Sequence, residues 1–152
     1  MIVRPARPGD AGAVAEMAAR FHALHGAPGG FSADIIRRDG FGERPWFDIL
    51  LAERAGGPCG YALFHDSYET GHAAPGLYLA DLWVDEAARG SGVATALLRG
   101  VAQAGRDRGA VFIWLVVQPW NAEALNFYAA REAGGESVEA RALTVEALLK
   151  RG

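Results

Sequence analysis

The seven residues from Arg89 to Thr95 read Arg-Gly-Ser-Gly-Val-Ala-Thr and have the composition of an anion-binding turn. Glycine lets the backbone turn tightly and approach a ligand closely. Val93, Leu97 and Val101 then recur at helical spacing, so we expect a helix whose first free amides and positive dipole end face the turn. The segment therefore predicts a pyrophosphate site, and glycines placed there for backbone reasons alone are the alternative.

Two other phosphate sites are excluded by the residues present. A Walker A loop needs a Gly-Lys-Ser or Gly-Lys-Thr ending, and the first lysine of the chain is Lys150. A dinucleotide site of the Rossmann type needs an acidic residue at a strand end about 20 residues after the glycines. Asp107 falls on or just after the predicted helix instead.

Two further side chains could move protons. Asp81 is the one charge in the apolar run Leu77 to Val84, and it is either a partnered structural acid or a proton acceptor. Tyr128 lies in a helix-like stretch that Asn121 could cap, and its phenol either packs as an amphipathic filler or donates a proton.

The elements that position these residues follow from periodicity and turn signals. Helices are expected after Asp10 and after Ser32, each of which is a predicted cap. The remaining helices are expected after Gly92 and over Ala122 to Arg131. The predicted strands are Ile2 to Arg4, Phe47 to Glu53, Gly60 to His65, Leu77 to Val84, Val111 to Val117 and Arg141 to Val145. This order indicates an α/β (α+β) protein with a mixed sheet.

Composition narrows the class of protein. The chain has 152 residues, 51% apolar and 22% charged, which predicts one globular domain over residues 1–152. Its net charge of -3, with scattered arginines, argues against nucleic acid as a partner. We expect no signal peptide, membrane span or membrane partner, and a cytoplasmic location. Cys59 is the single cysteine, and the four histidines lack metal-ligand spacing, so we expect no disulfide and no metal.

Two motifs in order resemble those of one enzyme family. Arg89, Gly92 and Ala94 fit the Arg/Gln-x-x-Gly-x-Gly/Ala acetyl-coenzyme A motif of the GNAT acetyltransferases, and residues 120–128 resemble their Asn-x-x-Ala-x-x-Phe-Tyr segment. Within the family, Asp39 to Pro45 and Leu77 to Val84 resemble the Asp-Gly-Phe-Gly-Glu-x-Pro loop and the Leu-Tyr-Leu-Glu-Asp-Phe-Phe-Val strand of the spermidine/spermine and thialysine acetyltransferases. The likeness covers nearly the whole chain.

The resemblance implies the GNAT fold: a mixed, mostly antiparallel sheet of six to seven strands with about four helices on its faces. It implies a homodimer that transfers acetyl from acetyl-coenzyme A to a primary amine of a small molecule, with Tyr128 as the proton donor to the coenzyme A sulfur. Asp81 is the second candidate catalytic residue, because it is the charged residue of its strand and not because of the resemblance. The cofactor residues that the resemblance implies are Leu82, Trp83, Val84, Arg89, Gly90, Ser91, Gly92, Val93, Ala94, Thr95, Asn121, Ala124 and Tyr128. The substrate residues are His22, Ala80, Asp81, Trp114, Leu115 and Val116.

The chain differs from this branch at the positions that are expected to bind the acceptor amine. Where the branch carries a glutamate as its base, this chain has Ala80. Asp81 would face the opposite side of a regular strand, so it could replace that acid only if a bulge reorients it. The segment Phe21 to Phe31 holds no acid but contains His22 and His25, which predicts an acceptor with fewer charges than spermine. A sensor that binds acetyl-coenzyme A without turnover and a protein acetyltransferase remain alternatives.

Overall fold

The computed structural model describes residues 1–151 as two compact units, residues 1–116 and the residues from 117 onward. The first contains the whole sheet and three α-helices, and the second contains two short helices. Within the described residues, no helix combines the length and hydrophobicity needed to cross a membrane. The expectation of one domain over residues 1–152 stays a prediction.

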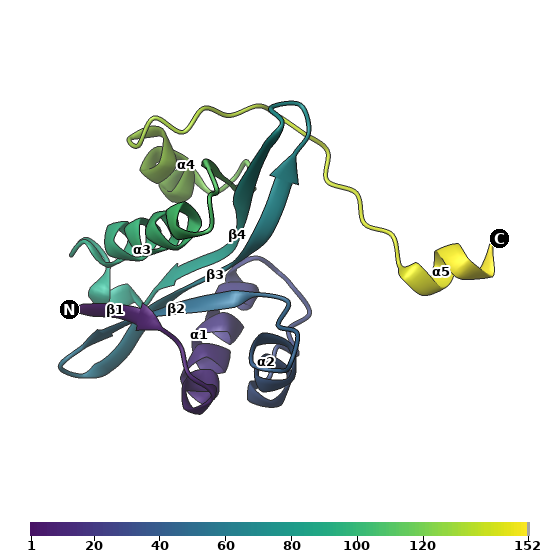
Figure 1. Ribbon diagram of the computed structural model, residues 1–152. Coiled ribbons are helices and arrows are strands. Elements are labelled where there is room, and N and C mark those ends of the chain that lie inside the picture. Colours follow the sequence, from purple (N-terminus) through teal and green to yellow (C-terminus); the bar gives the residue numbers. More distant parts are fainter. Residues whose placement is uncertain (152) are drawn as a thin grey trace. The chain divides into compact units, whose positions relative to one another are not determined.

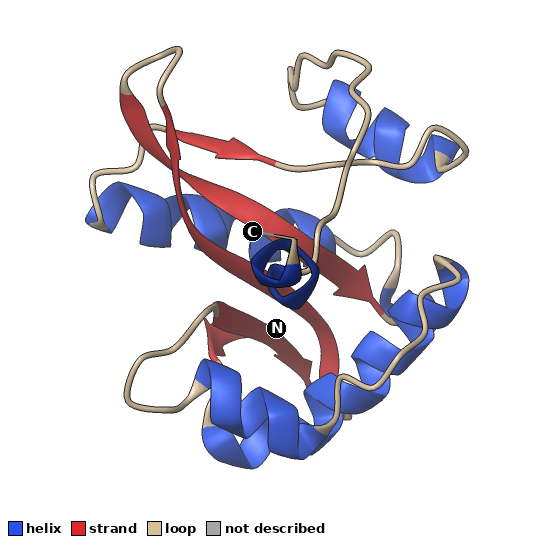
Figure 2. Ribbon diagram, turned by 90° about the vertical axis from the view of Figure 1, so that its right-hand side faces the viewer, coloured by secondary structure: helices blue, strands red, loops and turns tan. Residues whose placement is uncertain are grey.

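The first unit is built on one five-stranded sheet with strand order β1-β2-β3-β4-β5. The strands are β1 (Ile2–Pro5), β2 (Asp48–Arg54), β3 (Gly57–Glu69), β4 (Ala74–Val84) and β5 (Phe112–Trp114). The first four pair antiparallel, and β5 runs parallel to β4. The sheet is thus mixed and mostly antiparallel as predicted, and its twist is visible in Figure 2.

Helices cover both faces of this sheet (Figure 1). α1 (Ala11–Leu24) and α2 (Ala33–Gly40) pack on one face, and α3 (Val93–Asp107) packs on the other. Two short 3-10 turns, Pro8–Asp10 and Glu86–Ala88, precede α1 and α3. The α3-side core includes Leu97, Val101, Leu77 and Phe64, and the α1-side core includes Val14, Met17, Ile36, Tyr61 and Trp83.

The helix caps show which local predictions were correct. Ser32 Oγ accepts from the Ile35 amide at 3.3 Å, so the predicted cap of α2 is confirmed. Asp10 precedes α1, but its carboxylate accepts two bonds from Arg4, at 2.8 and 3.0 Å, rather than one from an α1 amide. A bidentate charge-assisted pair is stronger than a neutral cap bond, and it lowers the pKa of Asp10 below the ordinary value.

The predicted last strand, Arg141 to Val145, is wrong. Residues 139–144 have no regular structure, and Val145 begins the helix α5 (Val145–Lys150). The Thr144 hydroxyl caps this helix at the Ala147 amide (3.2 Å), and Glu146 pairs with Lys150 one turn later at 2.6 Å. These bonds stabilise a helix from within the segment itself, whereas a strand would need a neighbouring strand to pair with. The described sheet therefore has five strands, not six to seven.

Candidate acyl-transfer site

The glycine turn adopts the backbone that an anion-binding loop needs. Gly90 and Gly92 have φ values of 71° and 85°, in the left-handed region that favours glycine. At both positions the space where a Cβ would stand is open to at least 4 Å among the described atoms. The Ala96 amide donates to the Gly92 carbonyl at 3.0 Å, so the amides of Val93 and Ala94 precede the first bond of α3. These groups fit a phosphate oxygen.

The turn is fixed to the end of β4. Arg89 Nε donates to the Val84 carbonyl at 3.1 Å, and its guanidinium lies over the Trp83 ring at 5.1 Å from the centroid. Ser91 Oγ donates to the Ala88 carbonyl and accepts from Arg54. Thr95 lies in the first turn of α3. The predicted cofactor residues of the first unit, Leu82 to Val84 and Arg89 to Thr95, are therefore joined by direct contacts as well as by sequence.

One edge of β4 opens before that turn. β5 pairs with β4 only over Gly76 to Tyr78, and in the described part of the chain no β5 residue pairs with β4 beyond that point. The backbone groups of Leu82, Trp83 and Val84 on this edge are thus left to other partners. Their side chains pack in the two cores, so any functional role concerns their backbone.

The second half of β4 contains a bulge. Leu63 of β3 pairs with Asp81 and Phe64 pairs with Leu79, so Ala80 has no partner on β3. An extra residue shifts the alternation of side chains by one. Leu79 packs in the α3-side core, whereas Trp83 packs in the α1-side core, and Asp81 turns toward α1 with it. The condition under which Asp81 could replace the missing acid is therefore met, while Ala80 is exposed.

Asp81 is a largely buried acid with two neighbours. Tyr61 Oη donates to Asp81 Oδ2 at 2.7 Å, and His22 Nε2 of α1 lies 3.9 Å from the same oxygen. Burial raises the pKa of Asp81 above its ordinary value, and this effect is opposed by the Tyr61 bond and by the charges of His22 and His25. The site thus contains a carboxyl group held in place by a phenol and facing an imidazole.

Sequence reasoning missed Tyr61. A tyrosine within an apolar strand looks like any core aromatic, and its partner lies 20 residues away in the sequence. The signal is its register: Tyr61 pairs with Trp83, two residues from Asp81 on the neighbouring strand. Burial raises the pKa of Tyr61 well above the ordinary value, so the phenol remains a hydrogen-bond donor.

Three predicted substrate residues at the end of β5 have different surroundings. Trp114 contacts the Tyr78 ring, with centroids 4.6 Å apart, and donates from Nε1 to Ser67 Oγ at 3.1 Å. Leu115 packs in the α3-side core, away from the face that Asp81 takes, and Val116 is half exposed. The structure brings His22 and Asp81 together and does not place Leu115 with them, while Ala80 is the exposed neighbour of Asp81 in the bulge.

The remaining predicted residues belong to the second unit. Asn121 Oδ1 accepts from the Ala124 amide at 3.1 Å, which confirms the predicted cap of α4 (Ala122–Ala129). Tyr128 lies near the end of that helix with its ring at the edge of Phe127, at a centroid distance of 5.1 Å. Burial raises the pKa of Tyr128 to about 12, against a smaller opposing effect of Arg131. The phenol is therefore fully protonated at neutral pH.

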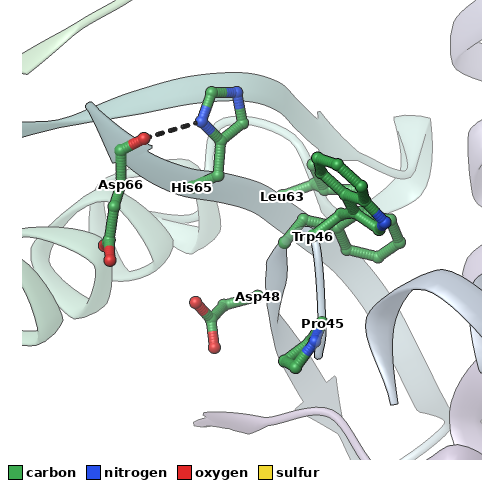
Figure 3. Close-up of a pocket in the computed structure, with 7 residues that line it drawn as sticks. Pro45, Trp46, Asp48, Leu63, His65 and Asp66 are labelled. Carbon is green, nitrogen blue, oxygen red and sulfur yellow. Dashed lines mark hydrogen bonds between the residues drawn. The ribbon is translucent and has the colours of Figure 1, made fainter. Parts of the chain in front are cut away.

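A pocket of about 550 Å³ lies on the other side of Leu63 from Asp81. Figure 3 shows Trp46 beside Leu63, with Asp48, His65 and Asp66 around the opening. The full lining consists of Pro45, Trp46, Phe47, Asp48, Leu63, His65 and Asp66. Arg108 Nη1 donates to Asp48 at 2.8 Å and to Asp66 at 3.0 Å, so one guanidinium serves two carboxylates. The pocket keeps one uncompensated negative charge.

In the described part of the chain, no group of three or more histidine, cysteine, aspartate or glutamate side chains is arranged to hold an ion. The single cysteine, Cys59, is buried, and burial raises the pKa of its thiol.

We predict that Asp81→Asn stabilises the fold relative to the parent, and that this gain in stability grows as pH rises. The raised pKa means that the carboxyl holds its proton to higher pH in the folded chain than in the unfolded chain. Its favourable contribution is thus present at low pH and is lost as pH rises through the folded pKa. Asparagine can still accept from Tyr61 without that loss, so the gain in Tm over the parent should be larger at about pH 7 than at about pH 4.

The matched control is Asp107→Asn, which makes the same change at an exposed carboxylate that also accepts one hydrogen bond, from Gln103 at 2.7 Å. Thermal melts at the two pH values measure the difference. Equal pH dependence in both variants would contradict a burial effect at Asp81.

Comparison with known proteins agrees with this geometry. Residues 16–134 match the Acetyltransferase (GNAT) family, a range that contains the glycine turn, Asp81 and Tyr128. The BH1408 protein from Bacillus halodurans has the same fold, with a TM-score of 0.80 and 20% identity over 95% of this chain and all of that chain. The predicted fold class is confirmed.

Two curated relatives are similar in sequence. The thialysine N-epsilon-acetyltransferase of Sus scrofa is 32% identical over 139 residues, which cover 84% of this chain and 81% of the relative. The protein of the same name from Bos taurus is 36% identical over 107 residues, and this match spans 65% of the chain and 62% of the relative's length. The chain is therefore an acetyltransferase of the GNAT family.

Proposed function

We propose that the chain transfers the acetyl group of acetyl-coenzyme A to a primary amine of a small molecule that carries at most one further positive charge. The observation that carries this proposal is the continuity of residues 82–95, where an open strand edge leads into a glycine turn and a helix N-terminus. Such an arrangement suits a ligand with an extended amide-containing arm that ends in a diphosphate.

Each part of acetyl-coenzyme A has a proposed partner. The diphosphate binds the amides of Gly90, Gly92 and the first turn of α3, with Arg89 beside it. The pantetheine arm and the acetyl oxygen pair with backbone groups of Leu82 to Val84. From the second unit, Asn121 and Ala124 are proposed cofactor contacts by resemblance. The co-substrate supplies the activated acetyl group, and these residues bind and orient it.

Tyr128 is the proposed acid. The departing thiolate of coenzyme A needs a proton, and a phenol whose pKa is raised to about 12 still carries one at every physiological pH. Its assignment to this role comes from the resemblance of residues 121–128 to the family segment. Phe127 stacks with Arg131 at 3.6 Å instead and is proposed to be structural.

The acceptor amine is proposed to approach from the α1 side of β4, where Asp81 and His22 lie. The relatives are thialysine acetyltransferases by name, and thialysine is an amino acid with a side-chain amine. The pocket around Trp46 has one unbalanced carboxylate and an indole that is 78% exposed, which suits the single charge at the far end of such an acceptor. A tetra-amine would bring more ammonium groups than this surface can offset.

The chain is also proposed to be cytoplasmic and homodimeric. The dimer rests on the family resemblance and on apolar side chains exposed around β5, at Val111, Trp114 and Val116. The location rests on the single cysteine, which precludes a disulfide within the chain. We propose no metal, nucleic-acid or membrane partner.

A turnover screen tests the proposed acceptor class. We predict that a lysine-like amine, such as thialysine or lysine, has a kcat/KM at least about tenfold above that of spermine, because each extra ammonium must leave water without a facing carboxylate. Thiol release from acetyl-coenzyme A measures both constants. A tenfold preference for spermine would overturn this assignment.

The pocket is tested in the same assay. Asp66→Asn should raise the KM for an acceptor with a distal ammonium, because it removes a carboxylate from the pocket lining. The KM for an amine with a neutral tail is the internal control and should stay unchanged.

The phosphate site is tested at Gly92. We predict that Gly92→Val lowers affinity for coenzyme A by at least about tenfold, because valine is strained at a φ of 85° and its branches fill the open space over the turn. Calorimetry measures the Kd. Gly109→Val is the matched control, since Gly109 has a φ of 82° and equally open space at the other end of α3. Equal affinity for coenzyme A in the two variants would contradict a diphosphate site at the glycine turn.

The acid is tested at Tyr128. Tyr128→Phe should leave the Kd of acetyl-coenzyme A unchanged and lower kcat by roughly 10²-fold or more, because the ring remains while the proton is lost. An unchanged kcat with the best acceptor would assign protonation of the thiolate to water or another group.

A further inference from the structure

The gap between His22 and Asp81 has dimensions that suit one nitrogen atom. His22 Nε2 and Asp81 Oδ2 are 3.9 Å apart, which is too long for a hydrogen bond between them. A single nitrogen can lie about 2.8 Å from both atoms, the ordinary distance of a charge-assisted bond. Resting on the proposed acetyl transfer, we propose that the ammonium of the acceptor binds between these two side chains and gives its proton to His22 Nε2.

The surroundings keep both partners in place. Tyr61 donates to Asp81 Oδ2 at 2.7 Å and uses one of several lone pairs of the carboxylate, so a second donor can be accepted. The His22 ring lies among aromatic neighbours, 5.7 Å from Phe21 and 6.2 Å from Phe31 between centroids. Both His22 and Asp81 keep partial access to solvent, with side-chain exposures of 23% and 14%. An amine can reach the gap, and a proton can leave it.

The titratable groups facing His22 come from three elements. Asp81 belongs to β4, Tyr61 to β3 and His25 to α1. The His25 ring is held by its own helix, with Nδ1 2.9 Å from the Phe21 carbonyl, whereas Nε2 of His22 faces Asp81. Burial keeps Tyr61 protonated, so the carboxylate is the one negative charge among these groups.

His22 and Asp81 have different proposed roles because an imidazole and a carboxylate differ in their chemistry. The carboxylate attracts the ammonium and afterwards stabilises the imidazolium, while the imidazole with its proton on Nδ1 offers the Nε2 lone pair. Asp81 is therefore a binding group, and His22 is the catalytic base. This pair takes over the function of the glutamate that the related branch carries at the position of Ala80.

The protons balance. The acceptor enters as R–NH3⁺ and loses one proton to His22, and the neutral nitrogen then forms a bond to the acetyl carbon. The carbon–sulfur bond breaks with its electron pair on sulfur. The thiolate gains one proton from the proposed acid, and the second proton, lost from nitrogen as the amide forms, restores the proton of that acid through solvent. Net, one acetyl group moves and one proton is released to solvent through His22.

The test is His22→Gln, which removes the titratable nitrogen and keeps a polar side chain. At about pH 7, kcat/KM for the best amine should fall by roughly 10²-fold or more, with the Kd of acetyl-coenzyme A unchanged. The defect should shrink for an acceptor of the same shape whose amine pKa is low, because that amine is already neutral. The same recovery is expected as pH approaches the amine pKa of about 10. A purely structural role would give an equal defect for both acceptors.

His72→Gln is the matched control. It makes the same change at a histidine whose side chain is 81% exposed near the β3–β4 turn. Its kcat/KM should equal that of the parent at each pH. The fall of kcat/KM toward low pH, the acidic limb of the parent's profile, should therefore persist in this variant.

A second readout does not depend on turnover. The ring resonances of His22, assigned by their disappearance in His22→Gln, should shift when the amine is added to the parent and not when it is added to Asp81→Asn. A base elsewhere is shown if His25→Gln, and not His22→Gln, removes the acidic limb, or if the parent amine shifts no His22 resonance. If instead the parent acetylates no amine at all, the proposed function fails rather than the assignment of its base.

Discussion

The alternation of side chains along β4 is the constraint on which the candidate site depends. In a regular strand, residues 77, 79, 81 and 83 would all face α3, and a carboxylate at 81 would be buried in an apolar core at high cost. One unpaired residue, Ala80, changes this. Leucines fill the α3 side before it, and Asp81 and Trp83 face α1 after it. The bulge thus allows one strand to pack leucines against α3 in its first half and to turn Asp81 and Trp83 toward α1 in its second half.

The two faces of the sheet differ in the side chains that they position. On the α3 side, the apolar core fixes the helix whose N-terminus follows the glycine turn. On the α1 side, a smaller core leaves an acid, a phenol and an imidazole in one place. Asp85 links the two regions, because it accepts from Trp83 Nε1 at 3.0 Å and from Arg20 of α1 at 2.9 Å. The α1 side of the sheet and the end of β4 that leads into the glycine turn are therefore connected through side chains.

Local chemistry explains what could be predicted from sequence. The helices after Asp10, Ser32 and Gly92 and the pairing of β2 with β3 follow from apolar periodicity, glycines and the Ser32 cap, all within a few residues. The bond between Tyr61 and Asp81 joins residues 20 positions apart and depends on strand register, which a short window does not contain. Arg141 to Val145 was misjudged because an apolar run without its partner strand is ambiguous, and the Thr144 cap decided it.

The exposure of Ala80 has an evolutionary consequence. Its side chain projects from the bulge to solvent, so the backbone that carries the site does not depend on which residue stands there. Selection can exchange alanine and glutamate at this position with little effect on folding. An acidic group can then be gained or lost beside Asp81 by a single codon change, while the pairing of β3 with β4 stays intact.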